Sequence, residues 1–374
     1  MSQTIRVATR KGLITVVRGG EGWHIDRTDF LAQPVSMVLA DRRDNTLYCA
    51  LRLGHFGPKL HRSEDRGKNW QEIAVPAFAA ARTAADTRTT ADAAATDKDQ
   101  KAPSVDMIWS LEAGGVDESG VLWAGTIPGA LFRSADKGDS WQLVTALWDL
   151  PARAEWFGGG YDQPGIHSIC VDPRNSNRLV LAISCGGVWY SEDAGASWSH
   201  RTQGMRAAYM PPERAYEPNI QDPHRMVACA AQPEALWVQH HNGMFRSTDR
   251  GLNWQEIENV QPSTFGFAVA VHPNEPDTAW FVPAVKDECR VPVNQQLVVT
   301  RTRDGGRSFE SLRTGLPQSE CYDLIYRHGL DVDAAGQCLV MGSTTGNLWI
   351  SENQGDSWQL AAGHLPPIYA VRFS

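Results

Sequence analysis

Three segments of the sequence concentrate side chains that could carry out acid–base chemistry. Residues 149–164, 203–223 and 313–323 each hold acidic, aromatic or basic residues between stretches rich in β-forming residues. A pair of carboxylates could cleave a glycosidic bond, one as the acid and the other as the base or nucleophile. A lyase would instead need a His or Tyr base and an Arg or metal to neutralise charge. The predicted catalytic residues are Glu155, Asp162, Glu217, Tyr209 and His167. The predicted substrate-binding residues are Arg206, Arg225, Tyr161, Tyr322 and Arg327.

Histidines offer a second possible chemistry. The turn QHHNG at 239–243 places His240 beside His241, where other parts of the chain have small residues, and His167 and His224 lie at or near the start of β-rich stretches. Imidazole nitrogens together with carboxylate oxygens can bind a divalent metal ion, and the same groups can serve as general acid and base. The predicted metal ligands are His167, His224, His240 and His241. Two alternatives stay open: a polar ligand pocket without metal, and hydrogen-bonded side chains that line a wet channel.

A motif that recurs six times indicates how these segments are positioned. Its first copy is SEDRGKNW at 63–70, and the copies share Ser or Thr, then Asp or Asn, then Gly, then a final Trp or Phe. The Asp or Asn falls at positions 65, 136, 193, 249, 304 and 353. Repeats spaced about 50 to 70 residues apart are typical of propellers, arrays and solenoids.

Each repeat reads as four short strands. In 165–202, the predicted strand segments GIHSICV, RLVLAIS, VWYS and WSHRT are separated by DPRNSN, CGG and the recurring motif. Short β-rich segments with Pro, Gly, Asn and Asp between them predict strands joined by turns. One four-stranded sheet for each repeat, arranged in a ring, is the architecture of a β-propeller. We therefore predict an all-β fold in a single domain, 1–374.

The ends of the chain predict seven blades, although six motif copies would also suit six. LPPIYAVRFS at 365–374 reads as one lone strand, and residues 4–28 read as three strands without an innermost partner. Joining the last strand to the first three would complete a seventh blade and remove exposed sheet edges.

The recurring motif resembles the Asp-box, or BNR, repeat of sialidases, sortilin-type receptors, xyloglucan-cleaving propellers and photosystem assembly propellers. The resemblance covers most of the chain, and it implies that the box turns are structural and lie on the face opposite the ligand site. It leaves function open, because the same fold hosts many activities. An enzyme acting on a carbohydrate or other polar small molecule is the first hypothesis, and a non-catalytic binding or assembly scaffold is the alternative. A true sialidase is disfavoured, since Arg6 is followed by Val7 and Ala8 instead of the Ile-Pro of those enzymes.

The composition of the chain indicates which kinds of partner and which cellular location to expect. The formal net charge of −8 disfavours binding to a nucleic-acid backbone. No apolar run reaches the length of a membrane span, and the N-terminal residues lack the apolar region of a secretory signal. Seven cysteines without a Cys-x-x-Cys pair favour reduced thiols and a cytoplasmic location. The Ala-, Thr- and Asp-rich segment 77–103 is predicted to be an insertion between the first two blades.

Overall fold

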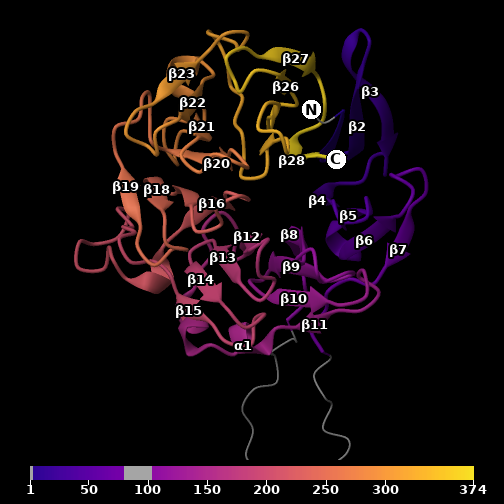
Figure 1. The fold of residues 1–374 in the computed structure, drawn as a ribbon, viewed down its shortest axis with the longest axis vertical. Helices are drawn as coiled ribbons and strands as arrows, with labels where there is room; N and C mark the ends of the chain where they lie inside the picture. The colour runs from indigo at the N-terminus through magenta and orange to yellow at the C-terminus, as the bar shows by residue number, and fades with distance from the viewer. Residues whose placement is uncertain (1–2, 80–102) are drawn as a thin grey trace, which may run out of the picture.

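Seven four-stranded antiparallel sheets form a closed ring in the computed structural model, which describes residues 3–79 and 103–374 (Figure 1). The prediction of a seven-bladed β-propeller is confirmed, and the alternative of six blades is wrong. Nearly all of the predicted insertion 77–103 lies outside the described residues. No helix among the described residues has the length and apolar character needed to cross a membrane.

Six blades follow one another along the chain, and each is built from its innermost strand outward. The strands of the first three are β4 (Val35–Ala40), β5 (Leu47–Arg52), β6 (Pro58–Ser63), β7 (Gln71–Ile73), β8 (Met107–Ala113), β9 (Leu122–Ile127), β10 (Leu131–Ser134), β11 (Gln142–Leu143), β12 (Ile166–Val171), β13 (Leu179–Ile183), β14 (Gly187–Ser191) and β15 (Ser199–His200). The strands of the next three are β16 (Pro223–Ala228), β17 (Leu236–His240), β18 (Gly243–Ser247), β19 (Gln255–Ile257), β20 (Gly266–Val271), β21 (Ala279–Pro283), β22 (Val299–Thr302), β23 (Glu310–Leu312), β24 (Leu330–Val332), β25 (Leu339–Gly342), β26 (Leu348–Ser351) and β27 (Gln359–Ala362).

The seventh blade joins the two ends of the chain. Its innermost strand is β28 (Ile368–Phe373), which pairs with β1 (Thr4–Thr9), and β2 (Gly12–Gly19) and β3 (Gly22–Asp29) follow outward. Both chain ends therefore lie beside each other in Figure 1. This pairing leaves β1 without a free edge, as the sequence predicted.

In the described parts of the chain, the helices are short and lie in the connections between strands. They are α1 (Thr145–Trp148) and the 3-10 helices η1 (Gly54–Phe56), η2 (Pro151–Glu155), η3 (Pro218–Ile220) and η4 (Val293–Gln295).

Hydrogen bonds within each Asp-box fix the turn between the third and fourth strands. In the first box, Ser63 Oγ donates to Asp65 Oδ1 at 2.8 Å and accepts the Gly67 N–H at 2.7 Å. Asp65 Oδ1 also accepts the Asn69 N–H at 2.9 Å. Gly67 has a φ of +86°, which favours glycine. Two box tryptophans also donate to the preceding blade: Trp141 Nε1 donates to Ala74 O at 3.0 Å, and Trp254 Nε1 donates to Arg201 O at 2.7 Å. The box residues therefore stabilise the turns and the contacts between blades.

The two faces of the ring carry different turns and connections of the blades. Because successive strands of a blade are antiparallel, the box turns share one face with the turns between first and second strands. The Lys137 N–H in a box turn accordingly donates to Gly120 O in such a turn at 2.8 Å. We call this side the box face. The opposite side, the loop face, holds the turns between second and third strands and the connections that lead into each innermost strand.

Candidate functional site

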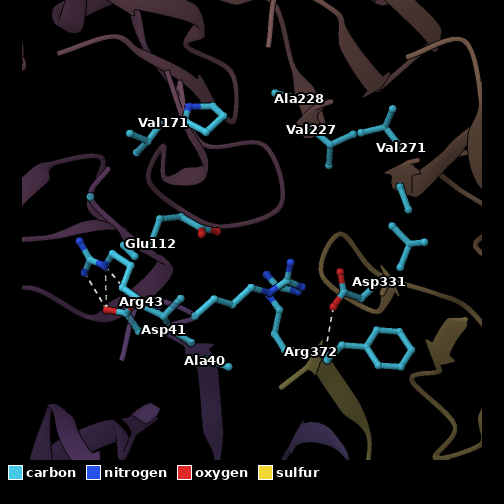
Figure 2. Close-up of a pocket in the computed structure, with 18 of the residues that line it drawn as sticks. Ala40, Asp41, Arg43, Glu112, Val171, Val227, Ala228, Val271, Asp331 and Arg372 are labelled. Atoms are coloured by element: carbon cyan, nitrogen blue, oxygen red, sulfur yellow. Dashed lines mark hydrogen bonds and ion pairs between the residues drawn. The ribbon is translucent and has the colours of Figure 1, made fainter. Parts of the chain in front are cut away.

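The two faces each carry cavities near the centre of the ring. A cavity of about 430 Å³ on the box face is lined by the ends of innermost strands, with Val171, Val227 and Val271 among its apolar residues (Figure 2). Two cavities of about 460 and 250 Å³ on the loop face share Gly160 and Arg327 in their walls. We call these two adjoining spaces the loop-face cleft, with a larger and a smaller cavity.

Aromatic rings and cations line the larger cavity. The Tyr161 ring stands edge-on to Trp109, with centroids 5.1 Å apart, and Arg52 lies 5.4 Å from the Tyr161 ring centroid. Asp106, the carboxylate in this wall, is already paired with Arg52 at 2.6 Å. The remaining wall residues that carry chemistry are Arg10, Arg290, Tyr326, Arg327, His328 and Tyr369. The larger cavity therefore has an excess of positive charge.

Arg327 is the central cation of the cleft. It is only 8% exposed, and its guanidinium carbon lies 4.9 Å from the Trp109 ring and 5.5 Å from the Phe267 ring. Within residues 3–79 and 103–374, no carboxylate comes within 4.0 Å of this guanidinium, and its Nε has no hydrogen-bond partner. Burial lowers the pKa of Arg327 from its usual value, and the negative charge of Asp222 offsets only part of that effect. A buried cation without an ion-pair partner is unfavourable, so the cleft is suited to a ligand that brings a negative charge.

The smaller cavity contains an Asp and two His in mutual contact. Asp222 Oδ2 lies 3.5 Å from His224 Nε2 and 3.3 Å from His241 Nδ1. Asp222 Oδ1 accepts hydrogen bonds from Ser184 Oγ and the Cys185 N–H, both at 3.1 Å. Burial alone would raise the pKa of the Asp222 carboxyl, but the two imidazoles hold that pKa well below its usual range. Asp222 is therefore an anion facing two ring nitrogens.

Five of the residues predicted from the sequence meet in the loop-face cleft. They are Tyr161, Tyr209, His224, His241 and Arg327. The Tyr209 ring lies 4.8 Å from the His241 ring, and its hydroxyl donates to Ile220 O in a short hydrogen bond. Burial raises the pKa of Tyr209. No observation tests a catalytic role for this tyrosine, which stays a prediction.

The three predicted catalytic carboxylates lie outside the cleft walls. Glu155 is exposed at the end of η2 and accepts a hydrogen bond from Asn219 Nδ2 at 2.8 Å. Glu217 pairs with Arg214 at 2.8 Å on the surface. Asp162 is exposed and lines neither cavity. The loops turn these side chains toward solvent or toward partners in their own vicinity, so the structure does not bring them together.

Three predicted substrate-binding residues also lie elsewhere. Arg206 pairs with Glu256 at 2.8 Å, and Tyr322 is 58% exposed beyond both cavities. Arg225 lines the box-face cavity, because it projects from the middle of β16 toward the other end of the ring centre.

Two of the four predicted metal ligands stand apart from the other two. His167 is fully buried, with Nδ1 2.9 Å from Ser168 Oγ. His240 is fully buried as well, and its Nε2 accepts the Asp222 N–H at 3.0 Å. Neither belongs to the cluster of possible ligands found among the described residues, which consists of Asp222, His224 and His241. The structure thus brings two of the four predicted ligands, His224 and His241, together with Asp222, and it places His167 and His240 outside that group.

Sequence reasoning assigned no role to Asp222 or Trp109. Asp222 lies two residues before His224, directly before β16, and that spacing could have suggested it. Trp109 lies on the buried strand β8 and is 7% exposed. A strand tryptophan reads as core, so the sequence has no signal for its position in the cleft.

In the box-face cavity, unlike the loop-face cleft, the walls are formed mainly by charged and aliphatic side chains. Asp41 pairs with Arg43 at 2.6 Å, and Asp331 Oδ2 accepts the Phe373 N–H at 2.9 Å (Figure 2). Burial raises the pKa of Asp331 and of Glu112. Among the residues that the structure describes, Phe373 is the one aromatic residue in the walls of this cavity, whereas Trp109, Tyr161, Tyr326 and Tyr369 line the larger loop-face cavity together with Arg327. We therefore take the loop-face cleft as the candidate site.

Comparisons with known proteins agree with the fold. The BNR-Asp box repeat model matches residues 60–73, which include the first box. A xyloglucanase of Paenibacillus sp is 42% identical over 153 residues, which cover 37% of this chain and 14% of the relative. The GH74 xyloglucanase structure from Xanthomonas campestris superposes with a TM-score of 0.64 at 16% identity, covering 97% of this chain and 53% of that one. The structure of YCF48 bound to D1 peptide superposes with a TM-score of 0.51 at 14% identity, covering 95% and 91%.

These matches differ in how much of each relative they include. The chain spans 14% to 30% of the curated xyloglucanases that it matches. At identities below 25%, the two superpositions establish a shared fold and nothing about activity.

Proposed function

We propose that the protein is a carbohydrate-active, glycoside-hydrolase-like propeller that binds a saccharide with an acidic group in the loop-face cleft. The observation that carries this proposal is Arg327, buried between Trp109 and Phe267 without a carboxylate partner among the described residues. A carboxylate on the ligand would form charge-assisted hydrogen bonds with this guanidinium.

The walls of the larger cavity support a saccharide in particular. Trp109 and Tyr161 offer apolar ring surfaces, and Arg52 and Tyr326 offer polar groups around them. Sites for small ligands combine such aromatic surfaces with a few polar groups that fix orientation. The similarity to xyloglucanases supports the same ligand class.

An acidic group on the saccharide allows two reactions in the cleft, hydrolysis and elimination. Asp106, Asp222 and Asp287 line the cleft, and each contacts an Arg or His. A hydrolase needs one carboxyl group as a general acid, with a raised pKa. A lyase instead removes the proton next to a neutralised sugar carboxylate, breaks the bond to the leaving oxygen and forms a carbon–carbon double bond. The ultraviolet absorbance of that unsaturated product would separate the two reactions.

Calorimetric titration with matched oligosaccharides tests the proposal. We expect oligosaccharides containing uronic acid to bind more tightly than neutral xyloglucan oligosaccharides, and Arg327→Gln to weaken acidic-ligand binding about tenfold or more. Arg206→Gln is the control, because Arg206 pairs with Glu256 outside the cleft. Equal binding of acidic ligands by wild type and Arg327→Gln would contradict the role of Arg327. Failure of every saccharide to bind would contradict the ligand class.

A peptide ligand is the second candidate. The comparison with peptide-bound YCF48 includes 91% of that chain, so a single propeller of similar extent binds a peptide. The C-terminal carboxylate of a peptide could pair with Arg327 as a uronic acid could. Titration with short acidic peptides in the same assay distinguishes these ligands, and peptide binding with no saccharide binding would favour the scaffold.

A further inference from the structure

We propose that Asp222, His224 and His241 bind a divalent transition-metal ion at the floor of the smaller loop-face cavity. One ligand atom from each residue lies within 4.8 Å of the other two. Two imidazole nitrogens and one carboxylate oxygen suit zinc and other first-row divalent ions better than magnesium or calcium, which prefer oxygen ligands. This inference does not depend on the identity of the ligand proposed above.

The hydrogen bond on the far side of His224 is the main argument. His224 Nδ1 lies 2.7 Å from Gly266 O. A carbonyl oxygen only accepts, so Nδ1 carries a proton and Nε2 is the nitrogen that faces Asp222. Nε2 and Asp222 Oδ2 lie 3.5 Å apart, which is longer than a charge-assisted hydrogen bond. An ion that takes the place of the Nε2 proton would be coordinated by both atoms, and a backbone partner on the second ring nitrogen is typical of metal-bound His.

The surroundings of Asp222 hold its other oxygen in place. Ser184 Oγ and the Cys185 N–H both donate to Oδ1 at 3.1 Å. Oδ2 is thereby directed at the two imidazoles, as a ligating carboxylate with outer-shell hydrogen bonds would be. His224 is held from behind as well, since it stacks on Phe267 with ring centroids 4.4 Å apart and an interplanar angle of 11°. Two of the three ligands are therefore fixed before any ion binds.

The third ligand and the cavity leave coordination positions open. His241 is partly exposed and comes from the turn between β17 and β18, and its side chain faces a cavity of about 250 Å³. Three protein ligands with room for water or substrate are typical of catalytic metal sites, whereas structural sites have four protein ligands. Arg327 lines the same cavity. An anionic ligand could thus contact both the ion and the guanidinium.

Metal analysis of the purified 374-residue chain tests the proposal without any saccharide. The protein is stripped with a chelator and dialysed, and then titrated with zinc and with cobalt, whose visible spectrum reports nitrogen and oxygen ligation. We expect one ion per chain in the wild type. Asp222→Asn and His241→Ala are expected to lose this stoichiometric ion, and Ser184→Ala to weaken its binding about 10- to 100-fold.

Asp222→Asn separates loss of metal from loss of fold. The new amide oxygen can still accept from Ser184 and Cys185, and its nitrogen can donate to His224 Nε2. The variant is therefore expected to keep the circular dichroism spectrum and melting temperature of the stripped wild type. His55→Gln is the control for removing a histidine, because His55 is exposed in η1 and remote in sequence from the cluster. The proposal is overturned if wild type binds no stoichiometric ion, or if Asp222→Asn and His241→Ala retain it.

Discussion

In the proposed site, Arg327 would favour ligand binding at the expense of stability. Its guanidinium is buried beside Trp109, and within the described ranges no carboxylate lies within 4.0 Å of it. Burial of a cation without a partner opposes folding, and this cost disappears when a ligand supplies the anion.

We expect Arg327→Met to leave the unfolding free energy of the ligand-free protein unchanged or to raise it. Methionine keeps apolar contact with the rings and removes the desolvated charge. Urea denaturation of both proteins measures the difference. A loss of stability of several kcal/mol, on the scale that follows when a buried ion pair is broken, would mean that an anionic partner of Arg327 exists within the chain.

At the scale of the structural element, the sixth Asp-box shows that the carboxylate charge can be replaced. Asn353 Oδ1 accepts the Ser357 N–H at 2.9 Å, as Asp193 Oδ1 accepts the Ser197 N–H at 2.8 Å. In the Asp193 box, the Ser197 hydroxyl donates to the second carboxylate oxygen at 2.6 Å. This bond and the backbone N–H lower the pKa of Asp193.

We therefore expect the stability difference between wild type and Asp193→Asn to depend on pH. A carboxyl group whose pKa is depressed by folding stabilises the native state above its unfolded pKa of about 3.9, and this contribution is lost as pH falls through the folded value. The wild type should melt at a higher temperature than Asp193→Asn at pH 7, and the gap should close toward pH 2. A gap that stays constant with pH would contradict the charge-assisted account of the box.

The box tryptophans make a second prediction at this scale. Trp254 is 6% exposed, and its Nε1 donates to Arg201 O at 2.7 Å in the preceding blade. Trp254→Ala should reduce the unfolding free energy by about 3–5 kcal/mol, because it leaves a cavity between blades. Trp254→Phe should cost less, since Phe309 already fills the corresponding position of the fifth box. Chemical denaturation checks both values, and similar losses for Ala and Phe would contradict a packing role.

At the scale of the whole molecule, closure of the ring depends on the last strand. β28 pairs with β1 through Val371 opposite Val7, and its residues pack in the core with Ile5 and Val340. Removing residues 368–374 would expose the edge of β1 and the apolar faces beside it. We expect the truncated chain to associate or unfold, as measured by size-exclusion chromatography and circular dichroism. A monomeric truncation with an unchanged melting temperature would contradict this account of closure.

The assembly of the blades into a ring also explains how much of the fold and of the site the sequence could predict. The six boxes and the unpaired strands at both ends predicted the blades and their closure, because those features depend on short-range patterns and on edge pairing. The site depends on how connections from different blades meet. Asp222 and His241 are close because two connections of one blade meet on the loop face, whereas Trp109 and Arg327 come from blades far apart in the sequence. Glu155 and Glu217 have carboxylates suited to catalysis, but these carboxylates bind Asn219 and Arg214 outside the cleft.

A crystal structure of the protein with a bound uronic-acid oligosaccharide tests the central claim most directly. The claim is that the loop-face cleft is the ligand site and that Arg327 receives the acidic group. We predict density for the sugar in the larger loop-face cavity, beside Trp109 and Tyr161, with its carboxylate within hydrogen-bonding distance of the Arg327 guanidinium. Density in the box-face cavity, beside Arg225 and Arg372, with the loop-face cleft unchanged, would contradict the claim.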